Sequence, residues 1–303
     1  MTERWAPLSE REGNAPDVLR EQVSDALEGP LREWLERALD HLGSNVARVA
    51  VRLDFRLYRA VDDNDEDNEV FQLAYGPSRE RLWDVVDAVL NLLPSGGWEQ
   101  TQLVRDMPKL TAALTMASSL PDIRFRVPLR QLLSDARAAY VIRSDGRALV
   151  RRVDPAVGAA VEEALKAADQ PERGSASRHL RQAMDLAYAL HPDPVKAYSE
   201  AIKAVECALH DTIQPNNRKA TLGTMKGELL QLQNKLRSAI TGSNGSEGLE
   251  TALKMMTLLW EGQTSRHGAR NQTRDETPEA ARMAVHLAAA LVQWFASGAI
   301  KKA

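Results

Sequence analysis

Residues 246–298 constrain the fold most, because they carry the pattern of two amphipathic helices joined by a long polar segment. Within each half, apolar residues recur at steps of three and four, which places their side chains on one helical face. Thr277 and Pro278 are typical of the N-cap and the first position of a helix. The two stripes are Leu249, Ala252, Leu253, Met256, Leu259 and Trp260, and then Ala280, Met283, Leu287, Ala290, Leu291 and Trp294. We therefore expect a pair of packed helices here.

The polar segment between the stripes, residues 261–276, has no large apolar side chain. At about 16 residues it is longer than a turn between packed helices requires, and long loops often carry function. Guanidinium groups bind phosphate well, and a histidine exchanges protons near neutral pH, so the segment could form an RNA-cleaving or anion-binding site. The free N–H groups of the following helix, at residues 277–280, would assist. Its basic residues are Arg266, His267, Arg270 and Arg274.

The alternative is that these arginines only brace the segment, by pairing with Asp275, Glu276 or Glu261. Glu206 borders an apolar helical stripe, so we expect it to be partly buried and to need a cation. Arg266 is the candidate partner, as a structural ion pair or as a residue that orients a site. We expect His286 to be an exposed histidine on the polar side of the last helix.

Similar patterns predict the rest of the chain. From about residue 174 onward we expect a bundle of five helices, one of which starts at Thr221 and extends to Ile240. Upstream, residues 139–153 have the pattern of a small β-hairpin with an Asp-Gly turn. We divide the chain into residues 1–138, a mainly helical region of unknown role; 139–173, hairpin, helix and linker; and 174–303, the bundle.

Three upstream segments have less uniform patterns. Gly29 and Pro30 should break the first helical pattern into two short helices. Residues 46–58 fit either a strand or a helical face, and their branched and aromatic content favours a strand. A further helix is expected over residues 98–120, with an interruption at Pro108.

Composition excludes several classes of function. The formal net charge of −3 argues against a generally basic nucleic-acid coat but allows a local basic patch. A single cysteine, Cys207, excludes an intramolecular disulfide and a cysteine-rich zinc site. We find no glycine-rich phosphate loop, nucleophile elbow or metal-ligand histidine pair, so we expect no cofactor and no metal. No apolar run approaches the ~18 residues that span a bilayer, so we expect a cytoplasmic protein without a membrane partner.

Five short motifs carry a family resemblance: PVKAYSEAIKAVE at 194–206, KATLG at 219–223, LWEG at 259–262, RHG at 266–268 and AVHLAAALVQWF at 284–295. In this order and spacing, over roughly residues 175–300, the chain resembles the abortive-infection C-terminal domain family. That family is helical and similar to the HEPN (higher eukaryotes and prokaryotes nucleotide-binding) superfamily. The resemblance implies a role in bacterial anti-phage defence, RNA as the target, and a homodimer that pairs through the last helices.

Active HEPN domains carry an arginine, a polar residue, and a histidine roughly four to six residues after the arginine. Counting from Arg266, no histidine stands at 271–273, and counting from Arg270, none stands at 275–277. The resemblance therefore implies the fold more strongly than it implies ribonuclease activity. Arg173 and His179 have the required spacing, but they fall in the expected linker.

We therefore expect a mainly α-helical protein with a HEPN-like C-terminal bundle that acts on or binds RNA or a nucleotide. If it is a metal-independent endoribonuclease, the catalytic residues are Arg266, His267 and Arg270, with His267 as the proton carrier. Ligand-binding residues would be Arg274, Asn271 and Glu206. The alternative is a non-catalytic scaffold module that binds a nucleotide or a protein with a degenerate HEPN site.

Overall fold

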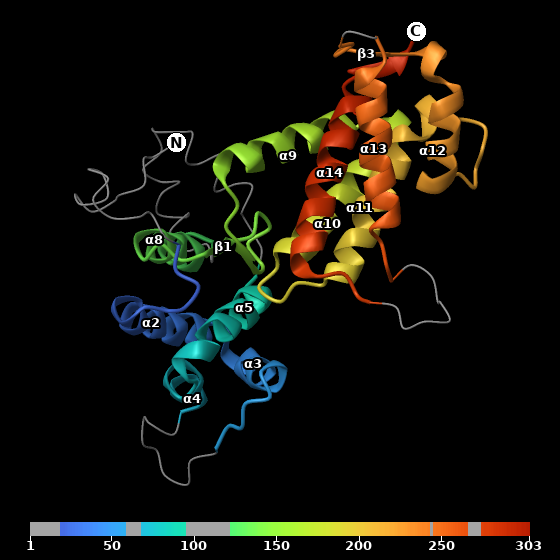
Figure 1. The fold of residues 1–303 in the computed structure, drawn as a ribbon. Coiled ribbons are helices and arrows are strands. Elements are labelled where there is room, and N and C mark those ends of the chain that lie inside the picture. The colour runs from blue at the N-terminus through green and yellow to red at the C-terminus, as the bar shows by residue number, and fades with distance from the viewer. Residues whose placement is uncertain (1–18, 59–67, 95–121, 243–244, 266–273) are drawn as a thin grey trace, which may run out of the picture. The chain divides into compact units, whose positions relative to one another are not determined.

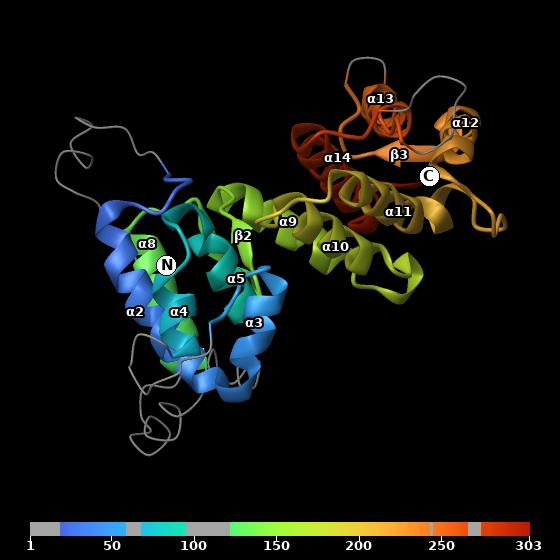
Figure 2. The same cartoon turned by 90° about the horizontal axis from the view of Figure 1, so that it is seen from below.

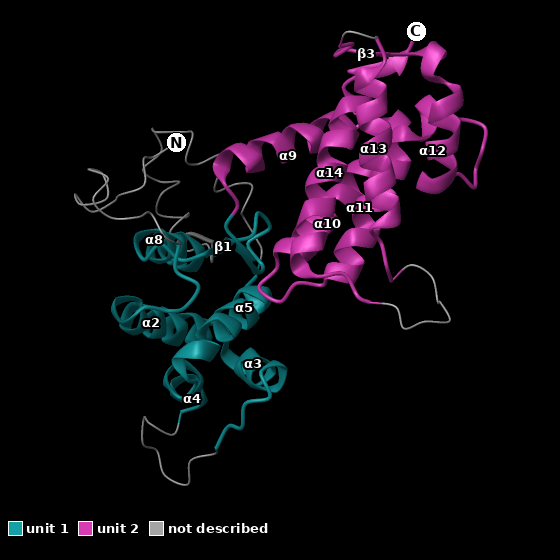
Figure 3. Ribbon diagram, in the orientation of Figure 1, with its two compact units in different colours: residues 1–152 teal, residues 153–303 magenta. Residues whose placement is uncertain are grey.

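The computed structural model describes residues 19–58, 68–94, 122–242, 245–265 and 274–303 (Figure 1). The chain divides into two compact units, residues 1–152 and 153–303 (Figure 3). This boundary falls inside the middle segment expected from the sequence, 139–173. The hairpin belongs to the first unit, and the helix that follows it packs on the last helix of the second unit.

Unit 1 is helical apart from one hairpin. Helix α2 packs against α4, α5 and α8, and its buried side chains form the centre of the core. The expected helix over 98–120 lies outside the described residues. The elements are α2 (Asp25–Leu42), α3 (Val46–Arg52), α4 (Glu69–Tyr75), α5 (Leu82–Leu92), α8 (Val127–Asp135), β1 (Tyr140–Ile142) and β2 (Leu149–Arg151), with short turns η1 (Gly43–Asn45), η3 (Arg79–Arg81) and η4 (Asp122–Arg126).

Helix α2 runs through Pro30 without a break, so the prediction of two short helices is wrong. A proline inside a helix costs about 3 kcal/mol, because it removes one hydrogen bond and crowds the preceding turn. Here one apolar stripe continues across the proline, from Leu27 to Leu31 and Trp34, and all three are at most 4% exposed. Burying side chains of this size gives about 1.5–3 kcal/mol each, which outweighs the cost.

Residues 46–52 form helix α3, so the preference for a strand is also wrong. Val46, Val49 and Ala50 are buried on one side of the helix, whereas Val51 is 80% exposed. This three- and four-residue spacing places the buried side chains where α3 packs against α5. Among the described residues no strand pairs with this segment.

The predicted hairpin is present, with β1 and β2 antiparallel and Val141 opposite Val150. Its turn is joined to the core through Arg126, which is 0% exposed. The guanidinium group donates to the backbone oxygens of Gly146 at 2.6 Å, Pro94 at 3.0 Å and Leu93 at 3.1 Å. These carbonyls compensate for burying the cation and hold α5, η4 and the hairpin turn together.

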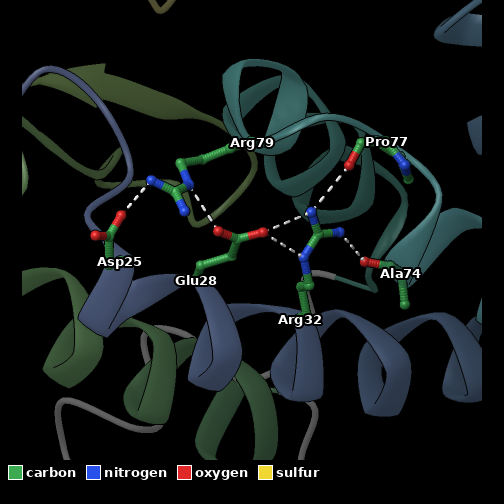
Figure 4. A network of polar contacts seen from close by, with 6 residues as sticks. All are labelled: Asp25, Glu28, Arg32, Ala74, Pro77 and Arg79. Carbon is green, nitrogen blue, oxygen red and sulfur yellow. Dashed lines mark hydrogen bonds and ion pairs between the residues drawn. The ribbon is translucent and has the colours of Figure 1, made fainter.

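A polar network joins α2 to the turn that follows α4 (Figure 4). Arg32 donates to the backbone oxygens of Ala74 at 2.8 Å and Pro77 at 3.0 Å, and to Glu28 at 2.9 Å. Arg79 also pairs with Glu28, at 2.6 Å. Hydrogen bonds from Arg32 and Arg79 lower the pKa of the Glu28 carboxyl. The network fixes the entry into α5 and is structural.

Unit 2 is a helical bundle (Figures 1 and 2). Helices α10, α11 and α14 pack together, α9 covers α14, and α12 and α13 complete the bundle. From residue 174 onward the described part contains the five helices that the sequence predicts. The elements are α9 (Pro155–Ala168), η5 (Pro171–Arg173), α10 (Ala176–Tyr188), α11 (Pro194–Ile213), α12 (Leu222–Gln231), η6 (Gln233–Lys235), β3 (Leu236–Ser238), α13 (Glu247–Glu261), α14 (Pro278–Ala296) and β4 (Ile300–Lys302).

The helix predicted from Thr221 begins as expected but ends early. Thr221 caps α12 in a reciprocal pair of hydrogen bonds with Thr224. The helix stops at Gln231, and the residues from Leu236 to Ser238 form β3, which pairs antiparallel with β4. The predicted extension of the helix to Ile240 is therefore wrong, because residues 236–238 pair with a strand that is distant in sequence.

The fold is mainly α-helical, as predicted. The hairpin in unit 1 and the β3–β4 pair in unit 2 are the two strand pairs of the described residues. Among the helices of the described part, none is long and apolar enough to cross a membrane.

Candidate anion-binding end of the helical bundle

One end of unit 2 gathers the end of α13, the start of α14 and the start of α11 (Figure 1). Tyr198, in the second turn of α11, lies against Gly262, which follows α13. A Cβ at Gly262 would lie 2.4 Å from the Tyr198 hydroxyl oxygen, so only a glycine allows this approach. The basic segment predicted as the site joins α13 to α14 at this end.

Hydrogen bonds close the base of that segment. The Thr264 hydroxyl donates to the backbone oxygen of Arg274 at 2.6 Å. The Ser265 backbone N–H and hydroxyl both donate to the Glu276 carboxylate, at 2.9 Å and 2.7 Å. Glu276 is only 6% exposed, so these bonds satisfy a buried charge. We call these four residues, Thr264, Ser265, Arg274 and Glu276, the clasp.

Helix α14 begins immediately after the clasp, as the sequence predicts. Thr277 is its N-cap and accepts a hydrogen bond from the Ala280 backbone N–H at 3.2 Å, and Pro278 occupies the first helical position. The clasp and the cap together hold residues 274–280 in one geometry.

Of the predicted site residues, Arg266, His267, Arg270 and Asn271 lie outside the described residues. Arg274 is exposed, and its backbone belongs to the clasp. Whether these residues bind or cleave a ligand stays a prediction.

Glu206 is half-buried, as expected, and has a structural role in the described part of the chain. Its carboxylate accepts a hydrogen bond from the Leu222 backbone N–H at 2.7 Å. A carboxylate at this position satisfies an otherwise unpaired N–H group at the start of α12 and interacts favourably with the helix dipole. Glu206 therefore joins α11 to α12.

The alternative interpretation of the segment was that its arginines pair with Asp275, Glu276 or Glu261. The two glutamates have partners elsewhere in the described part of the chain. Glu261 pairs with Lys226 at 3.1 Å, and Glu276 accepts from Ser265. Asp275 is exposed. These contacts assign the two glutamates to holding the helices and the clasp.

His286 belongs to a cluster that sequence analysis missed. It is half-buried, and its Nε2 lies 2.7 Å from the hydroxyl oxygen of Tyr188, the last residue of α10. The guanidinium carbon of Arg282 lies 5.6 Å from the centre of the Tyr188 ring, within cation–π range. The prediction of an exposed His286 is therefore wrong. The spacing of four places Arg282 and His286 on one face of α14, but it does not indicate the contact with Tyr188.

The chemistry of this cluster follows from its burial. Burial lowers the pKa of His286 below its ordinary value, so the imidazole is neutral at pH 7. A neutral imidazole can take up a proton, directly or through the Tyr188 hydroxyl. The Nε of Arg282 is buried and has no hydrogen-bond acceptor among the described residues. The cluster thus combines a proton acceptor with a cation two turns into α14.

Arg173 and His179, which have HEPN-like spacing, serve different contacts. Arg173 donates to the backbone oxygens of Ala208 and Phe295, both at 2.8 Å. His179 Nδ1 lies 2.5 Å from the Glu200 carboxylate. Because each side chain is held by its own partners, the two do not form a joint site.

Glu200 is a buried carboxylate of α11, 5% exposed. Burial raises its pKa, but hydrogen bonds from Lys203 and His179 outweigh burial and lower the pKa overall. The Arg178 guanidinium lies 3.0 Å from Nε2 of His179. Since arginine can only donate, Nε2 accepts and Nδ1 carries the proton toward Glu200. This network ties α10 to α11 and is structural.

Comparison of the chain with known protein families, with curated proteins and with solved structures gives no match. In the described part of the chain, no group of three or more histidine, cysteine, aspartate or glutamate side chains could hold a metal ion.

Proposed function

We propose that this protein acts in bacterial anti-phage defence of the abortive-infection type, with unit 2 as a HEPN-like domain that binds or cleaves RNA. The observation that supports this most is the clasp. It fixes both ends of the segment with Arg266, His267 and Arg270 at the start of α14. A cationic segment anchored at a helix N-terminus is suited to phosphate.

In this proposal Arg266 and Arg270 neutralise RNA phosphates, and His267 carries the proton that strand cleavage requires. Asn271 and Arg274 contribute further contacts to the ligand. Cleavage would need no metal ion, because the arginines stabilise the charge that develops on the phosphate. A second copy of the chain, paired through the last helices, would complete the site.

Purified full-length protein incubated with single-stranded RNA tests the site. Arg266→Gln/Arg270→Gln should weaken RNA binding by about tenfold, because two exposed cation–phosphate contacts of under 1 kcal/mol each add to about 1.4 kcal/mol. His267→Ala should abolish cleavage and leave binding intact. Arg181→Gln/Lys254→Gln, which removes the same charge from exposed positions elsewhere on unit 2, is the control. Equal binding and cleavage by all four proteins would exclude this site.

The cellular role has its own test. A phage should form fewer plaques on a lawn of bacteria that express the chain than on a lawn that expresses the Arg266→Gln/Arg270→Gln variant at the same level. Equal plaque numbers would contradict the defence role even if the purified protein binds RNA.

The alternative is a non-catalytic module that binds a nucleotide or a partner protein. Two observations favour it: no histidine completes the HEPN spacing after Arg266 or Arg270, and His286 and His179 are hydrogen-bonded within the bundle. Binding of RNA without cleavage, lost in the arginine variant, would favour this version.

A further inference from the structure

The two-stranded ribbon of unit 2 presents an unusual charge pattern. β3 and β4 pair antiparallel, with Leu236 opposite Lys302, Arg237 opposite Lys301 and Ser238 opposite Ile300. β4 follows α14, and β3 contacts α13 near its start, where Gly248 lies against Ser238 (Figure 1). The ribbon therefore lies at the end of α14 away from the clasp.

Side chains alternate between the two sides of the ribbon, so its basic residues fall into two groups. Leu236 and Ile300 are 6% and 2% exposed and face the bundle. Lys302 shares their side of the ribbon, and its Nζ donates to the backbone oxygen of Asp211 at 3.0 Å, in the last turn of α11. A cation there satisfies a terminal carbonyl and interacts favourably with the helix dipole. Lys302 is therefore structural.

The other side of the ribbon is basic and faces away from the bundle. Arg237 and Lys301 are exposed and directly opposite each other, and the exposed Lys235 immediately precedes the strand. In the parts of the chain that the structure describes, the side chains of these three residues have no ion-pair or hydrogen-bond partner. Like charges directly opposite on a sheet destabilise it. We call Lys235, Arg237 and Lys301 the basic face.

The positive charges of the basic face repel one another in the free protein, and no acidic side chain among the described residues neutralises them. Such a surface is suited to binding an anionic partner. We infer that the basic face binds the phosphate backbone of RNA, as a second contact for the strand that reaches the clasp end. This inference rests on the proposed function. No aromatic residue stands next to Arg237 or Lys301 in either strand, so the contact should be electrostatic and independent of base sequence.

The length of α14 sets the size of RNA that can make both contacts. Its 19 residues span about 28 Å at 1.5 Å per residue. A stacked strand advances about 3.4 Å per nucleotide, so about eight nucleotides connect the two ends. An RNA of about 20 nucleotides can reach both, whereas one of about four nucleotides cannot.

Fluorescence anisotropy with these two RNAs at several salt concentrations tests the inference on the full chain. Arg237→Gln/Lys301→Gln should weaken binding of the long RNA about tenfold and leave the short RNA unaffected. It should also reduce the slope of log affinity against log salt by about 1.4, since each single-strand phosphate contact contributes about 0.7. Arg181→Gln/Lys254→Gln carries the same charge change, and its binding should stay close to wild type.

A second variant separates binding from folding. Lys301→Glu replaces the repulsion with a cross-strand ion pair to Arg237, so its thermal midpoint should equal or exceed that of the wild type while its long-RNA affinity falls. A lower midpoint together with lost binding would mean that Lys301 is structural, which overturns the inference.

The outcomes distinguish this inference from the proposed function. If the ribbon variant binds the long RNA as the control does, while Arg266→Gln/Arg270→Gln loses affinity, the inference fails and the proposed function remains. If only the ribbon variant loses affinity, the clasp-end site fails, and the basic face is then a separate RNA contact, which overturns the inference that it acts as a second contact. Absence of RNA binding by the wild type, or stronger binding of anionic lipid vesicles than of RNA, overturns the inference.

Discussion

His286 shows how position in the bundle changes the chemistry of a helical histidine. By spacing alone it falls on the polar side of the last helix, and nothing adjacent in sequence indicates burial. Its partner Tyr188 stands 98 positions earlier in the chain, so sequence periodicity cannot reveal the contact. Thr277, by contrast, was predictable, because an N-cap depends only on the next few residues.

We predict that His286 makes stability depend on pH. Its folded pKa lies below the ordinary value of 6.5, so at mildly acidic pH the unfolded chain binds a proton that the folded chain does not. The contribution is complete above about pH 6.5 and is lost as pH falls through the folded pKa. Urea unfolding at several pH values should show a smaller loss of stability on acidification in His286→Gln than in the wild type.

Tyr188→Phe is the control for this prediction. It should lower the free energy of unfolding by about 1 kcal/mol at every pH, because it removes one hydrogen bond but leaves the titrating imidazole. Parallel pH curves for the wild type and His286→Gln would show that His286 does not titrate in this range.

At the scale of elements, local signals predicted where helices begin, and tertiary packing decided how far they extend. Thr221 and Thr277 cap helices at the expected residues. The errors concern α2, α3 and β3, where burial or a distant partner strand overrides the local preference. An eighteen-residue helix through Pro30 forms because its stripe is buried on both sides of the proline, which local propensity does not encode.

Pro30→Ala should therefore stabilise the protein. The change restores the hydrogen bond that proline cannot donate and removes the crowding of the preceding turn, together worth about 3 kcal/mol. Against this, the unfolded chain gains conformational entropy, which lowers stability by up to about 1 kcal/mol. We expect a net gain of about 2 kcal/mol, measured by chemical denaturation. Gly29→Ala, whose added Cβ meets nothing apart from its two chain neighbours, should gain less than about 1 kcal/mol, because the Cβ of a helical residue crowds the Cδ of the proline that follows it. A loss of stability in Pro30→Ala would mean that the ring itself fits the core.

On the scale of the whole molecule, the chain consists of two units with separate cores. The sequence predicted the helical bundle because its amphipathic stripes are long and regular. It did not predict the division after Arg152: the hairpin and the helix after it read as one intermediate segment, and only their packing assigns them to different cores. The residues proposed for RNA binding are known from the sequence, while the clasp and the basic face emerge from contacts between distant segments.

A fragment of residues 153–303 should fold by itself, since its apolar core is contiguous and lies within unit 2. Expressed alone, it should give a helical circular dichroism spectrum and one cooperative unfolding transition. The same fragment with Glu200→Ala should be destabilised by about 3 kcal/mol or more, because the buried charge network of α10 and α11 loses its centre. Non-cooperative melting of the wild-type fragment would show that unit 2 depends on unit 1.

The clasp has a consequence for how this protein can vary. Ser265 and Glu276 hold the two ends of the segment together. The packing of α13 and α14 therefore does not depend on which residues lie between those ends. Doubling the length of a segment closed in this way costs only about 0.6 kcal/mol in chain entropy. Natural variants, or an engineer inserting a peptide tag, could therefore exchange the contents of this segment while α13 and α14 keep their packing.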